Sequence, residues 1–142
     1  MKKLLLTLAA VVVLAAGALA QENFIKVSSL PSAARQNVKT YYPTATIVSA
    51  SKMVWNGKTS FKAAMDNGSY MFFDASGRWN MARSYDGLPD KFLPAKVRKY
   101  VSDYHEGQLI VEVQKLSKTY IITLSDETKL QFYHNGNFYG FK

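Results

Sequence analysis

Residues 30–43 read LPSAARQNVKTYYP, and residues 93–106 read LPAKVRKYVSDYHE. Both segments begin with Leu-Pro and then carry apolar side chains at helical spacing, which in the first segment are Leu30, Ala34, Val38 and Tyr41. This spacing predicts an amphipathic helix with a single apolar stripe. Proline suits the first turn of a helix, because the N–H that it lacks would have no partner there. The sequence therefore predicts two similar helices.

The stretch after each helix also repeats. Apolar and polar residues alternate as in half-buried strands, and we expect strands at 46–55, 59–66, 69–74 and 78–82, then at 108–116, 119–125, 128–134 and 137–141. Matched positions are first 63 and later 59 residues apart, because the second copy lacks four residues near positions 55–58. Such a period is typical of one supersecondary unit used more than once.

These patterns predict an α+β fold. We expect a tandem repeat of one helix plus a four-stranded antiparallel meander, forming one roughly eight-stranded antiparallel sheet with two helices on one face. The repeats span about residues 24–84 and 85–142, and together they make one domain, residues 21–142. A chain of this length buries a sufficient core without disulfide bonds, and it contains no cysteine.

Residues 1–20 have the layout of a secretory signal peptide. Lys2 and Lys3 precede an apolar run, and Ala18-Leu19-Ala20 supplies small residues at the cleavage site. We therefore expect a periplasmic or secreted protein without stable membrane insertion after cleavage. The whole chain has a net charge of +8. This balance can steer an acidic partner, but export and the lack of a tight Lys/Arg run argue against nucleic acid.

The tandem units resemble a known family. Each starts with Leu-Pro, the first helix ends at Tyr42-Pro43, and the first meander closes with residues 73–78, FDASGR. Behind a signal peptide, this arrangement is similar to the secreted PepSY-like, β-lactamase-inhibitor-protein-like family of Gram-negative bacteria. The second unit departs from the first at Glu106, where the proline is missing, and at His134, which replaces an alanine.

The resemblance implies a single sheet with helices on one side and a concave open face on the other. In the inhibitor that gives the family its name, that face grips a folded enzyme. For most members of the PepSY-like family no function is established, and the family offers no catalytic residues to carry over. The resemblance therefore implies a non-catalytic binding or inhibitor-like module.

Motifs for catalysis or cofactor binding are missing from the sequence. It has no Gly-x-Ser-x-Gly elbow, no His-Glu-x-x-His and no phosphate loop. His105 and His134 are better explained as surface residues at a helix end and in a turn. The Asp66-Asn67-Gly68 and Asp74–Gly77 segments lack the alternating oxygen ligands of a calcium loop and are typical turns. We expect no catalytic residue, no cofactor and no metal site.

Strand alternation points to one face of the sheet. If Met71, Phe73, Trp79, Leu130, Phe132 and Phe138 face the helices, then their neighbours face the other way. These neighbours are rich in aromatic residues, and exposed aromatic side chains often mark binding sites. The candidate partner-binding residues are Tyr70, Phe72, Arg78, Tyr133, Tyr139 and Phe141.

The partner expected from this pattern is a protein or peptide of the cell envelope. Two alternatives for the aromatic residues stay open, namely mutual support across strands and a homodimer through this face. One alternative function is a small-ligand carrier in the envelope, which needs an apolar pocket between helices and sheet. The other is an envelope hydrolase, which only secretion and scattered polar groups suggest.

Overall fold

The computed structural model describes residues 21–142. The predicted signal peptide, residues 1–20, lies outside the described residues. The elements follow one another in the order β1 (Gln21–Ile25), η1 (Val27–Ser29), α2 (Ser32–Tyr41), β2 (Ile47–Trp55), β3 (Lys58–Met65), β4 (Tyr70–Asp74), β5 (Trp79–Arg83), η2 (Asp90–Phe92), α3 (Ala95–Tyr104), β6 (Ile110–Lys115), β7 (Thr119–Leu124), β8 (Lys129–Tyr133) and β9 (Phe138–Phe141).

The nine described strands form one antiparallel sheet in which each strand pairs with the next strand in sequence. The predicted fold class is therefore confirmed, with two α-helices and a sheet of nine strands where roughly eight were expected. The extra strand is β1, which the sequence patterns did not indicate. It pairs along the outer edge of β2, from Gln21 opposite Val54 to Ile25 opposite Ala50.

Both helices end as their sequences predict. The N–H of Tyr42 donates to the Val38 carbonyl at the end of α2, and the N–H of His105 donates to the Val101 carbonyl at the end of α3. Pro43 cannot continue the first helix. After the second, Gly107 takes a φ of +82°, which is costly for any residue with a Cβ atom.

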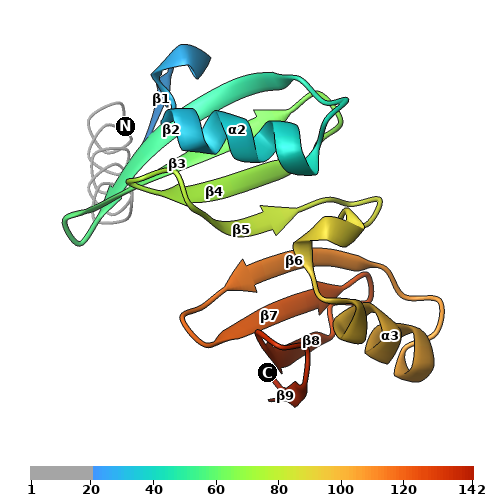
Figure 1. The fold of residues 1–142 in the computed structure, drawn as a ribbon. Coiled ribbons are helices and arrows are strands. Elements are labelled where there is room, and N and C mark those ends of the chain that lie inside the picture. Colours follow the sequence, from blue (N-terminus) through green and yellow to red (C-terminus); the bar gives the residue numbers. More distant parts are fainter. Residues whose placement is uncertain (1–20) are drawn as a thin grey trace, which may run out of the picture.

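The two helices lie on the same face of the sheet (Figure 1). Matched residues of the apolar stripes are buried there, Ala34 and Val38 from α2, and Val97 and Val101 from α3. The strands contribute every second residue, and the buried ones are Ala50, Ala63, Met65, Met71, Phe73, Trp79, Ala82, Val113, Ile122, Leu124, Leu130 and Phe132. These side chains belong to one hydrophobic cluster that includes residues from before and after position 84.

We call residues 21–84 the first half and residues 85–142 the second half. They carry the same order of α-helix and four strands, α2 with β2–β5 and α3 with β6–β9. Their origin from one repeated unit stays a prediction. The halves are joined through the pairing of β5 with β6 and through Phe92, whose ring stacks on Tyr41 with 4.1 Å between ring centroids. The edge of Trp79 meets the same Phe92 ring at 5.1 Å.

A buried chain of hydroxyl groups lies within the first half, at its junction with the loop that leads into the second half. The Tyr42 hydroxyl lies 2.6 Å from the Ser84 hydroxyl, which lies 2.9 Å from the Ser69 hydroxyl. Burial raises the pKa of Tyr42, and the hydrogen bonds from the two serines oppose this shift. The chain satisfies all three polar groups where the first half meets the loop into the second, so it fixes the direction in which that loop leaves β5.

The turn between the last two strands of each half packs on the start of its helix. A Cβ atom at Gly77 would lie 2.8 Å from the backbone nitrogen of Ala34, and one at Gly136 would lie 2.8 Å from the Lys96 Cβ atom. The φ angles of these glycines are +89° and +92°. Both positions therefore require glycine for two reasons, the backbone conformation and the close approach of the helix.

Candidate functional site

The candidate site lies on the sheet face opposite the helices, which we call the open face. One row of directly paired residues crosses this face over all nine described strands, Phe24, Ser51, Lys62, Phe72, Met81, Gln114, Ile121, Gln131 and Gly140. The next row consists of Ser49, Ala64, Tyr70, Arg83, Glu112, Thr123 and Lys129. Paired residues of an antiparallel sheet point to the same side, so each row is a line of neighbouring side chains.

The middle of the open face carries an aromatic pair beneath a cation. The rings of Tyr70 and Phe72 meet edge to face with 5.7 Å between centroids. The Lys62 ammonium lies 4.8 Å from the Tyr70 centroid and 5.7 Å from that of Phe72. Both rings are half-buried. The cation is attracted to the ring faces, and each contact limits the rotamers of the others, so this cluster is held in one arrangement.

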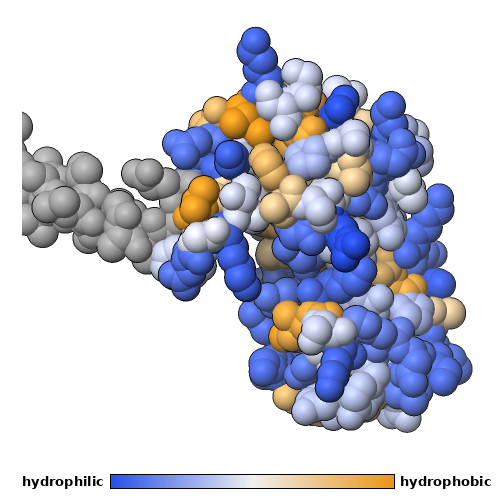
Figure 2. All heavy atoms as spheres, turned by 60° about the vertical axis from the view of Figure 1, so that its left-hand side comes forward, coloured by the Kyte–Doolittle hydropathy of each residue, from blue (hydrophilic) through white to orange (hydrophobic). Residues whose placement is uncertain are grey.

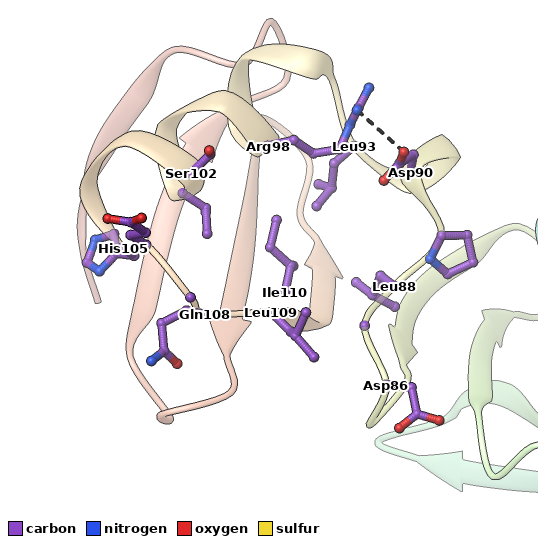
Figure 3. A pocket seen from close by; sticks show the side chains of 15 residues that line it. Asp86, Leu88, Asp90, Leu93, Arg98, Ser102, His105, Gln108, Leu109 and Ile110 are labelled. Atoms are coloured by element: carbon purple, nitrogen blue, oxygen red, sulfur yellow. Dashed lines mark ion pairs between the residues drawn. The ribbon is translucent and has the colours of Figure 1, made fainter.

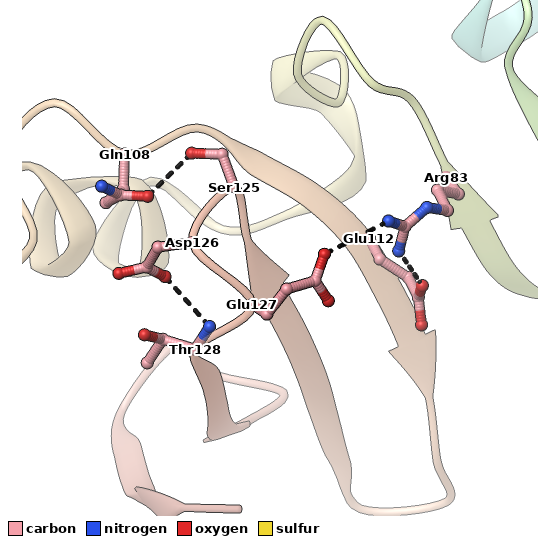
Figure 4. A network of polar contacts seen from close by, with 7 residues as sticks. All are labelled: Arg83, Gln108, Glu112, Ser125, Asp126, Glu127 and Thr128. Atoms are coloured by element: carbon pink, nitrogen blue, oxygen red, sulfur yellow. Dashed lines mark hydrogen bonds and ion pairs between the residues drawn. The ribbon is translucent and has the colours of Figure 1, made fainter.

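An ion pair crosses from the first half to the second beside that cluster. Arg83 on β5 donates to a carboxylate oxygen of Glu112 on β6 at 2.6 Å, and its other terminal nitrogen lies 3.7 Å from Glu127 (Figure 4). The hydrogen bond to Glu112 raises the pKa of Arg83. Burial raises the pKa of Tyr70, and the positive charge of Arg83 partly offsets this effect. Tyr70 therefore stays a neutral phenol at physiological pH.

We call the group formed by Lys62, Tyr70, Phe72, Met81, Arg83 and Glu112 the central cluster. The sequence prediction included only Tyr70 and Phe72 from it. Met81 pairs with Phe72, and Arg83 pairs with Tyr70, so β5 contributes as much to this surface as β4 does. A hollow of about 390 Å³ next to it is lined by Phe72, Met81 and residues of β6. The alternation of buried and outward-facing residues along β3 and β5 could have placed Lys62, Met81 and Arg83 on the open face.

Tyr133 and Tyr139 form a second aromatic pair on the open face. Their rings meet edge to face at 5.1 Å, and 45% and 56% of their surfaces are exposed. They belong to β8 and β9, so β5, β6 and β7 separate them from Tyr70 and Phe72 in the sheet. Four of the six predicted site residues thus form two aromatic pairs.

Two predicted site residues lie elsewhere. Phe141 pairs with the buried Leu130, and its ring faces His105 and Phe138 on the helix side of the sheet. Strand β9 has one extra residue, Tyr139, opposite positions 131 and 132 of β8. This bulge reverses the alternation along β9, which is why simple parity placed Phe141 on the open face. Arg78 is exposed in the turn before β5, where its N–H donates to the Asp74 carboxylate at 3.0 Å.

The side that carries the β2–β3 and β6–β7 turns shows hydrophobic residues as separate patches between hydrophilic ones (Figure 2). The exposed apolar side chains near these turns include Val54, Trp55 and Leu116. No single large apolar patch of the described residues is visible from this side (Figure 2). Scattered apolar side chains are usual on a protein surface that faces water.

The two histidines serve local structure. One ring nitrogen of His134 lies 2.9 Å from the Leu116 carbonyl and 3.2 Å from the Thr119 carbonyl, and the ring packs on Tyr120. His105 is the C-cap residue of α3, and its ring lies near the rings of Tyr100 and Phe141. Among residues 21–142 no three His, Cys, Asp or Glu side chains are grouped to hold a metal ion. The pKa of Asp74 is lowered by hydrogen bonds from Ser76 and the turn backbone, which is a structural effect.

A groove of about 430 Å³ lies on the helix side of the second half (Figure 3). It runs between α3, the loop before η2 and the start of β6. Apolar side chains such as Leu93 and Ile110 share its lining with charged ones. Asp90 and Arg98 form an exposed ion pair across its rim at 3.6 Å. This open, mixed lining differs from the largely apolar pockets that usually enclose small ligands.

Comparison with known proteins supports the fold and the family. The profile of the PepSY-like family, described as "Putative beta-lactamase-inhibitor-like, PepSY-like", matches residues 59–139. No curated protein matches the sequence. Neither described helix is long and apolar enough to cross a membrane.

Several solved structures from Bacteroides share the fold. A "putative calcium-regulated periplasmic protein" of Bacteroides thetaiotaomicron matches with a TM-score of 0.77 and 23% identity, over 85% of this chain and 96% of that one. A "putative periplasmic protein of unknown function" of Bacteroides vulgatus matches with a TM-score of 0.78 and 21% identity, over 86% and 99% of the two chains. At these identities the likeness shows the fold alone.

Proposed function

We propose a function from one premise, that this chain belongs to the beta-lactamase-inhibitor-like, PepSY-like family. The protein is a periplasmic, non-catalytic binding module, and the open face takes up a protein or peptide of the cell envelope. The periplasmic descriptions of the Bacteroides structures and the predicted signal peptide support this location. Tyr70 and Phe72 are the main anchors, and Tyr133 and Tyr139 form a second contact.

The observation that carries this proposal is the central cluster. Tyr and Arg dominate binding energy at protein interfaces, because each supplies a large contact area together with polar groups. Here the rings are fixed by the contacts with Lys62, and Arg83 is fixed by Glu112. A partner therefore meets a surface that loses little side-chain freedom on binding.

The charge of the cluster favours a partner with acidic and apolar groups. Arg83 is already neutralised by Glu112, whereas no carboxylate of residues 21–142 lies within ion-pair distance of the Lys62 ammonium. Lys62 thus leaves a net positive charge above the two rings. A carboxylate of the partner next to an apolar side chain satisfies both features, and the excess of basic residues over the whole chain attracts such a partner from a distance.

The test compares the two aromatic pairs of the open face. We expect the Tyr70→Ala/Phe72→Ala variant to lose at least tenfold in retention of a partner from native periplasmic extract, quantified by mass spectrometry. The Tyr133→Ala/Tyr139→Ala variant removes the same number of rings at the far end of the sheet and should lose less. Cooperative urea unfolding of both variants shows that the fold persists.

Retention that is unchanged in Tyr70→Ala/Phe72→Ala contradicts the proposal. Sedimentation equilibrium separates the homodimer alternative, because a dimer through the open face would dissociate in this variant. If the rings only support one another across strands, the variant should lose stability without any change in retention.

The small-ligand carrier stays as the second candidate, and the groove between α3 and β6 is the observation in its favour. A carrier should show saturable stabilisation by envelope lipids or other small apolar molecules in thermal unfolding, and Leu93→Glu should abolish it. A hydrolase has no comparable support among the described residues. The pKa values of Asp74 and Asp126 are lowered by hydrogen bonds within turns, which is a structural effect.

A further inference from the structure

The outer edges of β5 and β9 occupy the same position in their halves. Phe73 pairs with Trp79 and Met71 with Ala82 in the first half, and Phe132 pairs with Phe138 and Leu130 with Phe141 in the second. A bulge interrupts both pairings at the same point. Tyr70 and Lys129 are matched positions, each one residue before the pairs just named. Arg83 pairs with Tyr70, and the Lys142 N–H donates to the Lys129 carbonyl, so Arg83 and Lys142 correspond as well.

The edge of β5 is covered by β6. Val113 lies opposite Ala82, and Glu112 lies opposite Arg83 with the 2.6 Å ion pair between their side chains. The strand pairing extends past the end of β5, where the Ser84 N–H donates to the Val111 carbonyl. Main-chain hydrogen bonds, one apolar contact and one ion pair therefore define what β5 binds.

The edge of β9 has no strand on its outer side within residues 21–142. Phe141 of this strand has 68% of its surface exposed. Tyr104, which packs on the Tyr100 ring that covers Phe138 of β9, is 71% exposed. Unpaired N–H and C=O groups beside exposed rings form a template for another strand. Lys142 supplies the cation that Arg83 supplies on β5, and the described ion pairs do not include it.

A second copy of the chain fits this edge poorly. In a continuation of the sheet, β9 would pair with β2 of the next copy, as β5 pairs with β6, but β1 already covers the outer edge of β2. The free outer edge of β1 carries one carboxylate, Glu22, which already accepts a hydrogen bond from the Ser51 hydroxyl at 2.8 Å. A two-fold pairing of β9 with itself would offer only Phe138–Phe141 and its neighbours, which contain no carboxylate to meet Lys142. The charge and the free edge both favour a different strand.

We propose that the outer edge of β9 is a strand-addition site for an extended segment of a partner protein that alternates apolar and acidic residues. The segment binds in the register that β6 takes on β5, with an apolar side chain opposite Phe141 and a carboxylate opposite Lys142. Strand addition draws its affinity from main-chain hydrogen bonds and its selectivity from alternate side chains. This site is separate from the open face and does not depend on the function proposed for it.

The test uses residues 21–142 and a capped synthetic peptide with the sequence of residues 108–116, QLIVEVQKL, which contains β6. We expect saturable NMR shifts of the backbone amides of residues 138–142 upon titration. Lys142→Glu should weaken binding of this peptide about two- to fivefold, as for an exposed ion pair. The same variant should strengthen binding of a peptide with Glu112→Lys, and Lys118→Glu in the distant β6–β7 turn should change neither.

Three results would overturn the proposal. The first is an absence of saturable shifts at residues 138–142 up to millimolar peptide. The second is a set of shifts confined to β5 and β7, which would show that the peptide replaces β6 and leaves β9 free. The third is self-association through β9 in sedimentation equilibrium that the peptide does not compete with, which would assign the edge to a second copy.

Discussion

The aromatic residues beside the last strand have different surroundings in the two halves. In the first half, Phe92 from the second half covers Tyr41, Tyr42 and Trp79. In the second half, the corresponding Tyr104 is 71% exposed, and Phe138 is covered by Tyr100, which stacks on it at 4.6 Å. Matched residues are thus buried or exposed according to whether a neighbouring unit packs beside them, and within residues 21–142 only the first half has another helix and meander after it.

Phe92→Ala is expected to have the largest effect on this comparison. Removal of a buried ring costs about 3–5 kcal/mol of unfolding free energy, and Phe92 is 2% exposed between aromatic neighbours from the first half. Phe141→Ala, at the uncovered end of the second half, should cost about 0.5 kcal/mol as a surface change. Urea unfolding of both variants measures the difference. Equal losses would show that Phe92 does not join the halves.

The turn glycines give the next largest effect. Gly77→Ala combines a left-handed backbone with contact against the α2 backbone, so we expect a loss of about 2–4 kcal/mol. Gly136→Ala should cost a similar amount, because the atom that a new Cβ would meet is the Lys96 Cβ atom, whose position is fixed by the α3 backbone. Gly68→Ala, with φ +84° and open space around it, measures the backbone contribution alone. Thermal unfolding measures the stability loss of the three variants. A loss in Gly77→Ala equal to that in Gly68→Ala would contradict close packing of the β4–β5 turn against α2.

The hydroxyl chain belongs to the first half alone, because His105 stands where Tyr42 would repeat. Ser84→Ala leaves the Tyr42 and Ser69 hydroxyls without their common partner, so we expect a loss of about 1–3 kcal/mol. Ser28→Ala, an exposed serine, should be neutral. Adding Tyr42→Phe should recover part of the loss, and a strictly additive double variant would show that the two hydroxyls are not coupled.

The smallest expected effect is a change in how the stability of the protein depends on acidic pH. Asp74 in the β4–β5 turn has a lowered pKa, and Tyr133 occupies the matching position in the second half. A carboxylate with a lowered folded-state pKa stabilises the protein above its ordinary pKa, and this contribution is lost as the pH falls through the folded-state value. Asp74→Asn should therefore cost about a few tenths of a kcal/mol at pH 7, since the carboxylate is only partly shielded from water. The difference from the unchanged protein should shrink as the pH falls below the ordinary pKa of a carboxyl group, and a constant difference would exclude titration of Asp74.

The sequence was sufficient to predict the helices, the meanders and the side of the sheet that the helices cover, because these depend on local periodicity. Strand β1 was not predicted, since residues 21–25 have no strong alternation and become a strand only against β2. The bulge that turns Phe141 toward the helices is likewise a matter of pairing. A period-2 count fails wherever one strand contributes an extra residue.

The centre of the candidate site was only half predicted for a related reason. Tyr70 and Phe72 are identified by alternation within one strand. The ion pair of Arg83 with Glu112 depends on which strands of the two halves meet and in what register, and no local pattern in either half contains that information. Local sequence patterns therefore identify surfaces within a unit better than surfaces where units join.

The neighbour-to-neighbour order of the strands affects how the chain can fold. Since every described strand after β1 pairs with the one just before it in sequence, no strand has to wait for a distant part of the chain. Contacts of short sequence separation favour fast folding. A polypeptide that emerges into its compartment with the N-terminus first can thus build this sheet progressively, and each completed hairpin presents the edge on which the next strand assembles.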